Sequence, residues 1–388
     1  MEHRIKVLFI IETLDTGGAE KLLLSTLKYL DRDRFEPIVI FLFKGDTLQK
    51  SLEDIGVEVV GPVLKHYDVP SLNSAFDFFR CLRLVKKEIQ SINPDIIHTH
   101  LFFANIYGRL AGRVAGVKKI ISTYHCTDYT HNIKKSLKFK IRKMLDLLSG
   151  KFLTHMIVAG NEAVKIDVET HLKFNNLVLI YNGIDVNEFL VPSNKEEILS
   201  LKKELLLEEN DVILLNIGRL DHQKGQEYLL KALPLVIKSN INVKLLIAGV
   251  GPLEKELKEL SNNLNIENKV KFLGKREDIQ KIIKMSDLFV FPSIFEGMAI
   301  APMEVMACKR PIITSDYLGA REVVTNKVEG FIVPTRNEDQ LAKSITKLIN
   351  VPSLRKEMGE KAFIKVSSKF NISKNVKEIE DVYISLLN

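Results

Sequence analysis

Hydrophobic and polar residues follow one another in regular blocks along the chain. Short apolar runs, typical of strands buried on both faces, alternate with longer segments whose apolar residues recur at helical spacing. We predict strands at residues 5–11, 37–43, 57–60, 95–99, 119–123, 156–159 and 177–180, and again at 212–216, 243–248, 269–273, 287–292, 311–314 and 330–333. Because strands alternate with helices, this order predicts parallel, doubly wound α/β sheets.

The length of the chain predicts two domains. At 388 residues, the chain is about twice as long as a single domain of roughly 150–200 residues. A turn signal at 182–185 and a polar, helix-prone stretch at 192–209 separate the two series of strands. We therefore place one Rossmann-like domain at 1–190, a second at 191–370 and a final helix at 371–388.

Composition and charge narrow the cellular setting without identifying a function. The formal charge of +7 and the pI near 9.0 favour anionic partners only weakly, because such an excess is common in soluble enzymes. The three cysteines are far apart, which predicts neither disulfides nor a zinc site and fits a reduced, cytoplasmic protein. No apolar run approaches the ~20 residues of a membrane span, and the N-terminus does not resemble a signal peptide.

The strongest candidate for chemistry is the segment 295–304, in which Glu296 and Glu304 bracket an apolar stretch. It follows a predicted strand, and Pro302 suits the first position of a helix, which would place Glu304 in the first helical turn. The backbone N–H groups of residues 298–300 would then be free to bind a ligand at the carboxyl edge of the sheet. The alternative is an ordinary helix start, since the macrodipole stabilises Glu there without a ligand.

A second candidate is the glycine-bounded loop 218–225, which carries Arg219 and Lys224. A guanidinium and an ammonium group spaced in this way can converge on a diphosphate and stabilise it as a leaving group. The alternative is a solvated loop. The next turn, 249–254, resembles the start of a dinucleotide fingerprint, but Glu254 stands where its third glycine should be, which disfavours a nicotinamide dehydrogenase.

The first half offers weaker signals. Gly17 and Gly18 lie between a strand and a helix, where they form either an anion site or a plain turn. His125 follows a strand, as a neutral hydrogen-bond donor to a substrate hydroxyl or as a satisfied loop histidine. The pair Asp31 and Asp33 could suggest a metal clip, but its position between a helix and a strand favours a solvated turn.

The segment 131–155 combines basic and apolar residues at helical spacing. Its basic residues are Lys134, Lys135, Lys138, Lys140, Arg142, Lys143 and Lys151, and its apolar positions are Ile133, Leu137, Ile141, Met144, Leu145 and Leu148. Such a helix can lie on an anionic membrane, where each basic residue contributes ~1 kcal/mol. In the alternative, the apolar stripe packs on its own domain and the charges face water.

Taken together and in this order, the motifs resemble the GT-B glycosyltransferases, specifically the large family 4 of retaining enzymes. The similarity extends over nearly the whole chain, although each motif alone is weak. The motifs are Thr16–Glu20, His98–His100, Tyr124–His125, Asn182–Asp185, Gly218–Arg219 with Lys224–Gly225, Gly249–Pro252, Glu296 with Glu304, and Gly319 with Glu322. One departure is Tyr317–Leu318, which stands where many relatives have a glycine pair.

The resemblance implies a role for each matching position. Arg219 and Lys224 would hold the donor diphosphate, Glu304 the ribose hydroxyls, and Glu296 with the backbone to Ile300 the sugar. The donor site would be completed by Gly17, Gly18, Gly251, Met298 and Ala299, with His125 near the reaction centre and His100 and Asn105 on the acceptor. The two domains would face a central cleft, the last helix would return to the first domain, and no metal or other cofactor would be required.

These implications lead to one main hypothesis and two alternatives. The main hypothesis is a cytoplasmic, peripheral membrane enzyme of surface (capsule-type) polysaccharide synthesis. It would transfer a hexosyl or N-acetylhexosaminyl unit from a UDP-linked donor to a lipid-linked or saccharide acceptor, and no nucleic-acid partner is expected. The first alternative is a nucleotide-sugar-binding scaffold without turnover. The second is a GT-B phosphorylase or epimerase, which would need an additional base or cofactor lysine.

Overall fold

The protein consists of two compact α/β units. The computed structural model describes residues 4–64, 75–125, 129, 137–192, 194–239, 242–296 and 299–388. One unit comprises Met1–Gly183 together with Ile372–Asn388, and the other comprises Ile184–Asn371. The sequence-based boundaries at 190/191 and 370/371 therefore differ from those of the structure, at 183/184 and 371/372. The reason is local pairing: the Ile184 N–H donates to the Phe370 carbonyl at 2.9 Å, which ties Ile184 to the second unit.

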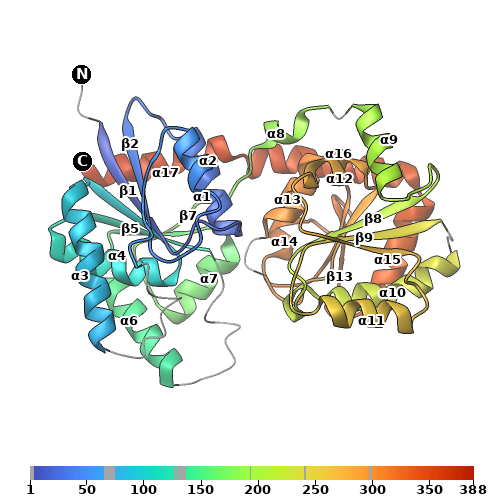
Figure 1. Cartoon of the computed structure of the whole chain (residues 1–388), viewed down its shortest axis with the longest axis horizontal. Coiled ribbons are helices and arrows are strands. Elements are labelled where there is room, and N and C mark those ends of the chain that lie inside the picture. Colours follow the sequence, from blue (N-terminus) through green and yellow to red (C-terminus); the bar gives the residue numbers. More distant parts are fainter. Residues whose placement is uncertain are drawn as a thin grey trace. The chain divides into compact units, whose positions relative to one another are not determined.

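The first unit contains a seven-stranded sheet in the order β3-β2-β1-β4-β5-β6-β7, whose neighbouring strands are all parallel (Figure 1). Its strands are β1 (Ile5–Ile11), β2 (Phe35–Phe41), β3 (Glu58–Val60), β4 (Ile96–His100), β5 (Lys119–Tyr124), β6 (Met156–Ala159) and β7 (Leu177–Leu179). Its helices are α1 (Gly18–Tyr29), α2 (Gln49–Asp54), α3 (Ala75–Ile92), α4 (Phe102–Ala115), α6 (Leu137–Leu153), α7 (Glu162–His171) and α17 (Ile372–Leu387).

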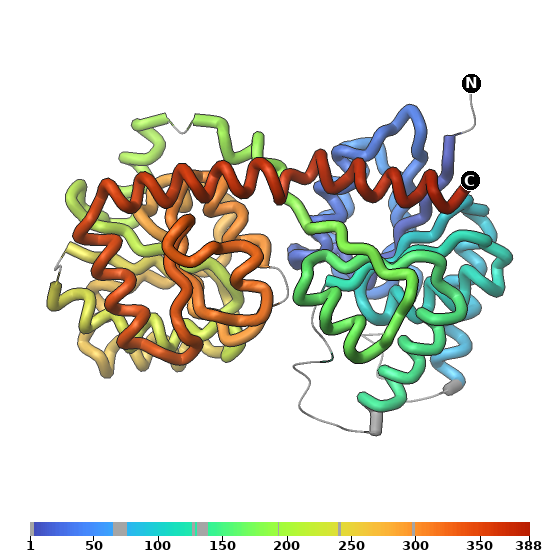
Figure 2. Tube along the Cα trace, turned by 180° about the vertical axis from the view of Figure 1, so that it is seen from behind, coloured from blue at the N-terminus to red at the C-terminus, as the bar shows by residue number. Residues whose placement is uncertain are grey.

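The two faces of this sheet are covered by different helices. Helices α3 and α4 pack on the face that presents Leu8 and Ile10 of β1. Helices α1 and α17 pack on the opposite face, which presents Val7 and Phe9. Figure 2 shows α17, at the red end of the chain, lying along the first unit beside the blue N-terminal segments. The alternation of buried side chains along β1 is what allows one strand to serve both faces.

The second unit contains a six-stranded parallel sheet in the order β10-β9-β8-β11-β12-β13. Its strands are β8 (Val212–Ile217), β9 (Val243–Ala248), β10 (Val270–Gly274), β11 (Leu288–Phe291), β12 (Ile312–Ser315) and β13 (Gly330–Val333). Its helices are α8 (Val186–Leu190), α9 (Lys195–Glu204), the 3₁₀ turn η1 (His222–Lys224), α10 (Gln226–Ser239), α11 (Glu254–Asn263), α12 (Ile279–Met285), α13 (Ile300–Ala307), α14 (Ala320–Val323), α15 (Glu338–Asn350) and α16 (Pro352–Lys369).

These two sheets confirm the predicted doubly wound architecture. Every predicted strand is present, and most bounds shift by only one or two residues. The predicted last helix is also present, and it belongs to the first unit. Within the residues that the structure describes, none of the helices combines the length and the apolar character that crossing a membrane requires.

Candidate active site

The second unit brings together Lys224 and Glu296, which are far apart in the sequence. Lys224 ends the turn that follows β8, and Glu296 follows β11, the strand paired with β8. Because parallel neighbours present their carboxyl ends at one edge, the two side chains meet. Lys224 Nζ donates to Glu296 Oε1 at 2.6 Å, and the Glu296 side chain is only 7% exposed. An ammonium and a carboxylate are therefore fixed at the sheet edge where ligands bind in such folds.

Neighbouring side chains complete this cluster. Gln223 Nε2 donates to Glu296 Oε2 at 3.2 Å, so each carboxylate oxygen has a partner. Lys224 Nζ also lies 5.3 Å from the centre of the Phe291 ring. Burial, followed by the charge of Glu296, raises the pKa of the Tyr317 hydroxyl, which keeps it protonated. Sequence reasoning missed Gln223, although its place beside Lys224 in a tight turn was an available signal.

Arg219 stands at the start of the same loop but extends outward. Its side chain is 71% exposed and lies 3.6 Å from Asp221. The backbone of this loop is held by the loop that follows β9, because the Leu220 N–H donates to the Val250 carbonyl at 3.1 Å. A Cβ on Gly251 would lie 2.3 Å from the Leu220 carbonyl oxygen. Gly251 therefore permits the close approach of two loops in this structure.

Helix α13 begins earlier than the sequence predicts. It starts at Ile300 with Ala299 as its N-cap, so Pro302 is the third helical residue and Glu304 lies beyond the first turn. The prediction that Pro302 opens the helix is wrong, because proline is tolerated throughout the first turn, where N–H groups have no intrahelical partner. The predicted donor contact at Met298 lies outside the described residues.

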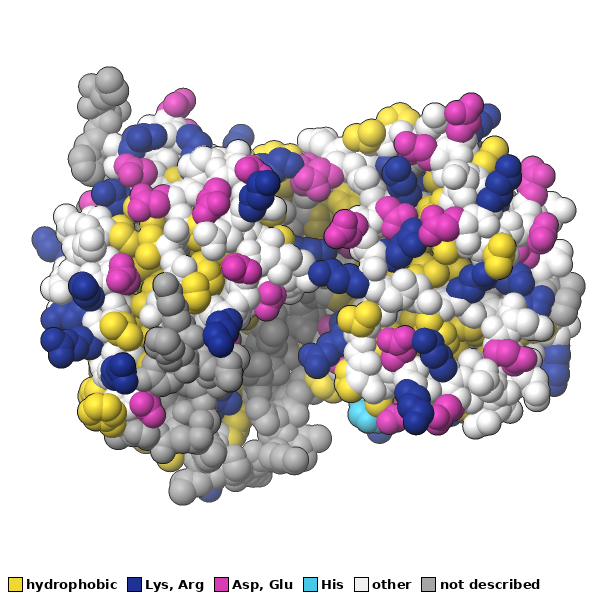
Figure 3. Space-filling view, viewed as in Figure 1, with side chains coloured by type: hydrophobic (Ala, Val, Ile, Leu, Met, Phe, Trp, Pro, Cys, Tyr) yellow, Lys and Arg dark blue, Asp and Glu magenta, His cyan; other side chains and the backbone are white. Residues whose placement is uncertain are grey.

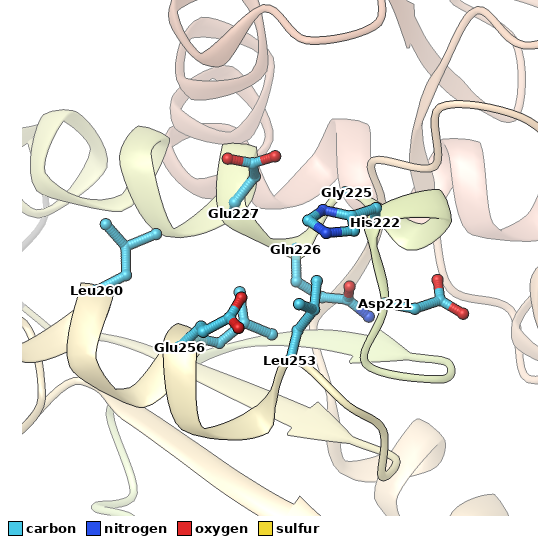
Figure 4. Close-up of a pocket in the computed structure, with 9 residues that line it drawn as sticks. Asp221, His222, Gly225, Gln226, Glu227, Leu253, Glu256 and Leu260 are labelled. Carbon is cyan, nitrogen blue, oxygen red and sulfur yellow. The ribbon is translucent and has the colours of Figure 1, made fainter.

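A cavity of about 120 Å³ lies beside this loop, between α10 and α11. Its lining residues are Asp221, His222, Gly225, Gln226, Glu227, Leu253, Glu256, Leu257 and Leu260. Figure 4 shows Gln226, Leu253 and His222 converging on it, whereas the carboxylate of Glu227 points away from Leu253 and Glu256. Since neither Lys224 nor Glu296 lines this cavity, it is separate from their cluster.

Three histidines of the first unit lie in a row: His98 lies within β4, His100 ends that strand, and His125 directly follows β5. His100 Nδ1 and His125 Nε2 are 3.1 Å apart, so one ring donates a hydrogen bond to the other. The rings of His98 and His100 also lie side by side, with their centres 4.4 Å apart. Among the described residues, His100 Nε2 and His125 Nδ1 have no hydrogen-bond partner. His125 can therefore offer Nδ1 to a ligand while Nε2 remains held.

Burial keeps these histidines neutral. It lowers the pKa of His98 to about 3 and the pKa of His125 to about 4. Burial, with the nearby His98 and His125, also lowers the pKa of His100 well below its ordinary value. At neutral pH, each ring consequently has one donor and one acceptor nitrogen.

The remaining predicted residues of the first unit occupy different environments. Gly17 is the N-cap of α1, and a Cβ there would lie 2.2 Å from Glu20 Oε2. The Glu20 carboxylate thus already approaches this helix start, and Thr13 donates to it at 3.1 Å. Asn105 is buried and accepts a hydrogen bond from Thr99 at 2.7 Å, so its side chain braces the interior.

Helix α6 presents part of its apolar stripe to the outside. Ile141, Met144 and Leu148 are 43%, 52% and 46% exposed, so the alternative in which the stripe packs on its own domain is wrong for these three. The buried face instead carries Asp146, whose Oδ1 accepts from Arg109 Nη1 at 2.6 Å, with both side chains 0% exposed. Residues 131–136, including Lys134 and Lys135, lie outside the described part of the chain, and the Lys138 side chain is likewise not described.

Neither a patch of like charge nor a group of possible metal ligands marks a further site in the views and ranges described below. On the face of the second unit seen in Figure 3, basic and acidic side chains are interspersed. Across the described ranges, no three His, Cys, Asp or Glu residues are grouped in a way that could hold a metal ion. Asp31 and Asp33 form the expected turn, in which the Asp33 N–H donates to Asp31 Oδ1 at 3.0 Å. Independence from metals stays a prediction.

Comparison with protein families accounts for most of the chain. Residues 16–188 match the family described as Glycosyltransferase Family 4, and residues 197–365 match the family described as Glycosyl transferases group 1. The solved structure of the Anabaena HepE protein in complex with UDP superposes with a TM-score of 0.84 at 23% identity, covering 98% of this chain and 100% of that chain. That likeness establishes the fold.

Two curated relatives extend over most of the sequence. An Escherichia coli protein named UDP-Gal:alpha-D-GlcNAc-diphosphoundecaprenol alpha-1,3-galactosyltransferase is 29% identical over 96% of this chain and 94% of its own length. A capsular polysaccharide biosynthesis glycosyltransferase of Staphylococcus aureus is 27% identical over 87% of this chain and 88% of its own length. The chain therefore belongs to the group 1, family 4 glycosyltransferases and is a transferase with the GT-B fold.

Proposed function

We propose that this glycosyltransferase retains the anomeric configuration and moves a hexosyl or N-acetylhexosaminyl unit from a UDP-sugar to a hydroxyl group of a lipid-linked or saccharide acceptor. The observation that carries the proposal is the cluster of Lys224, Glu296 and Gln223 at the carboxyl edge of the second sheet. It combines a cation for phosphate with a carboxylate for sugar hydroxyls. The product would enter cell-surface polysaccharide synthesis.

The proposed roles divide by charge. Arg219 and Lys224 bind the donor diphosphate, since a guanidinium fork and a compact ammonium both suit phosphate oxygens. Glu304 accepts hydrogen bonds from the ribose, and Glu296 with the backbone of Ala299 and Ile300 binds the sugar. Lys224 would have to shift its hydrogen bond from Glu296 toward phosphate when the donor arrives, leaving Gln223 to hold the carboxylate.

The first unit contributes the remaining proposed roles. We propose that His125 contacts the donor sugar, that Gly17 and Gly18 approach the phosphates, and that His100 lies toward the acceptor. His125 suits a hydroxyl partner because its Nδ1 is unpartnered among the described residues. The neutral ring can form one hydrogen bond there without introducing a charge. The Asn105 side chain is buried, so we propose that it supports the acceptor region through Thr99.

The proposed reaction is a displacement on one face of the sugar. The acceptor oxygen supplies an electron pair to the anomeric carbon as the bond from that carbon to the diphosphate oxygen breaks. The bonding electrons leave with the diphosphate, which also takes the proton of the acceptor hydroxyl. Arg219 and Lys224 stabilise the negative charge that develops on the leaving group.

A uridine diphosphate donor is supported by two similar proteins. The Anabaena structure was solved in complex with UDP, and the Escherichia coli relative is named for a UDP-Gal donor. We expect UDP and one UDP-sugar to raise the melting temperature without added metal, because a ligand at 100 times its Kd stabilises a fold by about 2.7 kcal/mol. Transfer to a polyprenyl-diphosphate-linked sugar would then be measured by chromatography. Stabilisation by other nucleotides only would contradict the UDP donor, and binding without transfer would favour a scaffold.

We also propose that α6 rests on the cytoplasmic leaflet of an anionic membrane. Ile141, Met144, Leu148 and Phe152 form an outward row along this helix, and Phe152 is 69% exposed. Lys140 and Lys151 are exposed beside the row. Apolar residues that enter the interface and lysines that meet anionic head groups are the two components of such binding.

Flotation with liposomes tests this docking. We expect the protein to float with vesicles containing anionic phospholipid and to remain behind with zwitterionic vesicles. Replacing Met144, Leu148 and Phe152 with Ser, or Lys140 and Lys151 with Glu, should reduce flotation. Lys255→Glu is a matched control, since Lys255 is an exposed lysine on α11 of the second unit. Binding unchanged by both sets of substitutions would exclude α6 as the docking surface.

A further inference from the structure

A side chain of the last helix reaches the histidines of the first unit. Tyr383 of α17 is fully buried, and its hydroxyl lies 2.7 Å from His98 Nδ1. Its ring meets Phe9 and Phe35 edge-on, with centre distances of 6.5 and 5.6 Å. The two phenylalanine rings therefore fix the position of the Tyr383 ring, and its hydroxyl makes a hydrogen bond with His98.

His98 is held at both ends of its ring. Its Nε2 lies 2.7 Å from the Thr123 hydroxyl, so both nitrogens have a hydroxyl partner. Because neutral imidazole has one donor and one acceptor, and a hydroxyl can serve as either, both of its hydrogen-bonding positions are satisfied. The His98 ring cannot rotate without losing two buried hydrogen bonds. It therefore presents a fixed surface against which the His100 ring packs.

The next step along the row couples two tautomers. If His100 Nδ1 donates to His125 Nε2, then His125 must carry its proton on Nδ1 and can donate from that nitrogen. If the direction is reversed, His125 Nδ1 can only accept. The position and tautomer of His100 thus decide what His125 offers to a ligand.

A small cavity on the other side of His100 is also bounded by the last helix. It has a volume of about 20 Å³, enough for one water molecule, and its lining includes His100, His125 and Asn375 of α17. Within the described structure, Asn375 Oδ1 and His100 Nε2 are buried without a hydrogen-bond partner. Helix α17 therefore contacts His98 through Tyr383 and borders the cavity beside His100 through Asn375.

We propose that Tyr383 and His98 are positioning residues that hold the His100–His125 pair, so that the C-terminal helix sets the geometry of His125. The inference rests on the proposed contact of His125 with the donor sugar. Tyr383 and His98 themselves touch neither donor nor acceptor in this proposal. Burial raises the pKa of the Tyr383 hydroxyl well above its ordinary value, which keeps it available as a hydrogen-bond donor.

The test compares two substitutions on the same helix. Tyr383→Phe removes only the hydroxyl that contacts His98, whereas Val376→Ala removes buried apolar atoms and leaves that hydroxyl in place. We expect Tyr383→Phe to lower kcat about 3- to 10-fold, the scale of one lost hydrogen bond, with a less than about twofold change in donor Kd. Val376→Ala should lower stability and leave kcat near that of the parent protein.

Nitrogen NMR of the protein labelled in its histidines supplies a readout that does not depend on turnover. Tyr383→Phe should shift the ring nitrogens of His98 and also those of His100 and His125, assigned with His100→Gln and His125→Gln. Val376→Ala should leave them in place. Thr123→Val, which removes the other partner of His98, provides a second variant with the same expected shifts if Tyr383→Phe does not fold.

The outcomes separate this inference from the proposed function. If His125→Ala lowers turnover while Tyr383→Phe leaves both turnover and the His125 nitrogens unchanged, the positioning role is wrong and the role of His125 stands. If His125→Ala retains full turnover, the proposed contact of His125 fails, and the inference fails with it. Equal effects of Tyr383→Phe and Val376→Ala on the nitrogen signals would also overturn it, because general loosening of the helix would then suffice.

Discussion

The two units have similar sheets but place their polar groups differently. The first unit buries an ion pair, Arg109 with Asp146, and two histidines, His98 and His100. The second unit has an apolar core that includes Leu214, Leu245 and Ile313, and it also buries uncharged polar side chains such as Asn216. Its ion pair Lys224–Glu296 lies instead at the edge of the sheet, where Lys224 keeps 18% of its side chain exposed.

This difference indicates what each polar group is for. A buried charge without its partner is costly, so polar residues of the first unit are tied to folding as well as to function. A charge at the edge can exchange its partner for a ligand at much smaller cost. Substitutions should therefore affect stability first in the first unit, and ligand binding or turnover first in the second.

The largest expected effect is on the buried ion pair. Asp146→Ala leaves Arg109 charged and fully buried, and it also removes the acceptor for the Tyr124 and Tyr129 hydroxyls. We expect the free energy of unfolding to fall by ~3–5 kcal/mol. Urea unfolding measures it, with Glu357→Ala as control: Glu357 pairs with Lys361 at 2.6 Å on the surface, and its loss should cost less than ~1 kcal/mol. If both variants lose the same free energy of unfolding, the proposed difference between buried and exposed ion pairs is wrong.

At the edge of the second sheet, Lys224→Ala should lower turnover more than donor binding, because the charge on the leaving diphosphate grows in the transition state. We expect a loss of ~2.7–4 kcal/mol in transition-state stabilisation, measured as kcat with saturating donor. Lys231→Ala is the control, since Lys231 is bound to Glu227 at 3.0 Å on the neighbouring helix. An unchanged kcat in Lys224→Ala would remove Lys224 from the proposed machinery.

A smaller effect is expected at Glu304. Glu304→Gln should weaken donor binding by ~1.5–3 kcal/mol, the scale of hydrogen bonds to a charged group, with little change in stability. Isothermal titration with UDP tests this against Glu254→Gln, an exposed acid that pairs with Lys258 at 2.7 Å. A large loss of stability with unchanged affinity would assign Glu304 to the fold and break the proposed division of roles.

The last prediction concerns the pH dependence of stability, in which the change per pH unit is small. The pKa of His125 is about 4 in the folded chain, below its ordinary value of 6.5, so the unfolded chain binds the extra proton first as the pH falls. The free energy of unfolding is therefore unaffected by this histidine above pH 6.5, and it falls as the pH is lowered from 6.5 to about 4. His125→Gln should reduce the slope by up to ~1.4 kcal/mol per pH unit in this window. Identical slopes by urea unfolding would show that His125 is not held neutral.

The alternation of residues along the chain predicted both sheets, because continuous apolar runs have few alternatives to buried parallel strands. It also predicted that the segment with Glu296 follows a strand and lies at the carboxyl edge of the sheet, whereas the contact between Lys224 and Glu296 came from the structure. Gln223 was missed although it stands beside Lys224 in the same turn, because a glutamine in a polar loop carries no hydrophobic pattern. The start of α13 was placed at Pro302 rather than Ile300, because proline is compatible with several first-turn positions.

The sequence by itself determined the two-unit α/β architecture and the segments that carry chemistry, since local periodicity and turn residues depend only on neighbours along the chain. Only the tertiary structure decided that Tyr383 stands against His98, that α6 buries Asp146 rather than its apolar stripe, and that Gln223 shares Glu296 with Lys224. Each of these contacts joins residues from different elements. Their geometry follows from the packing of whole sheets and helices, which no local pattern encodes.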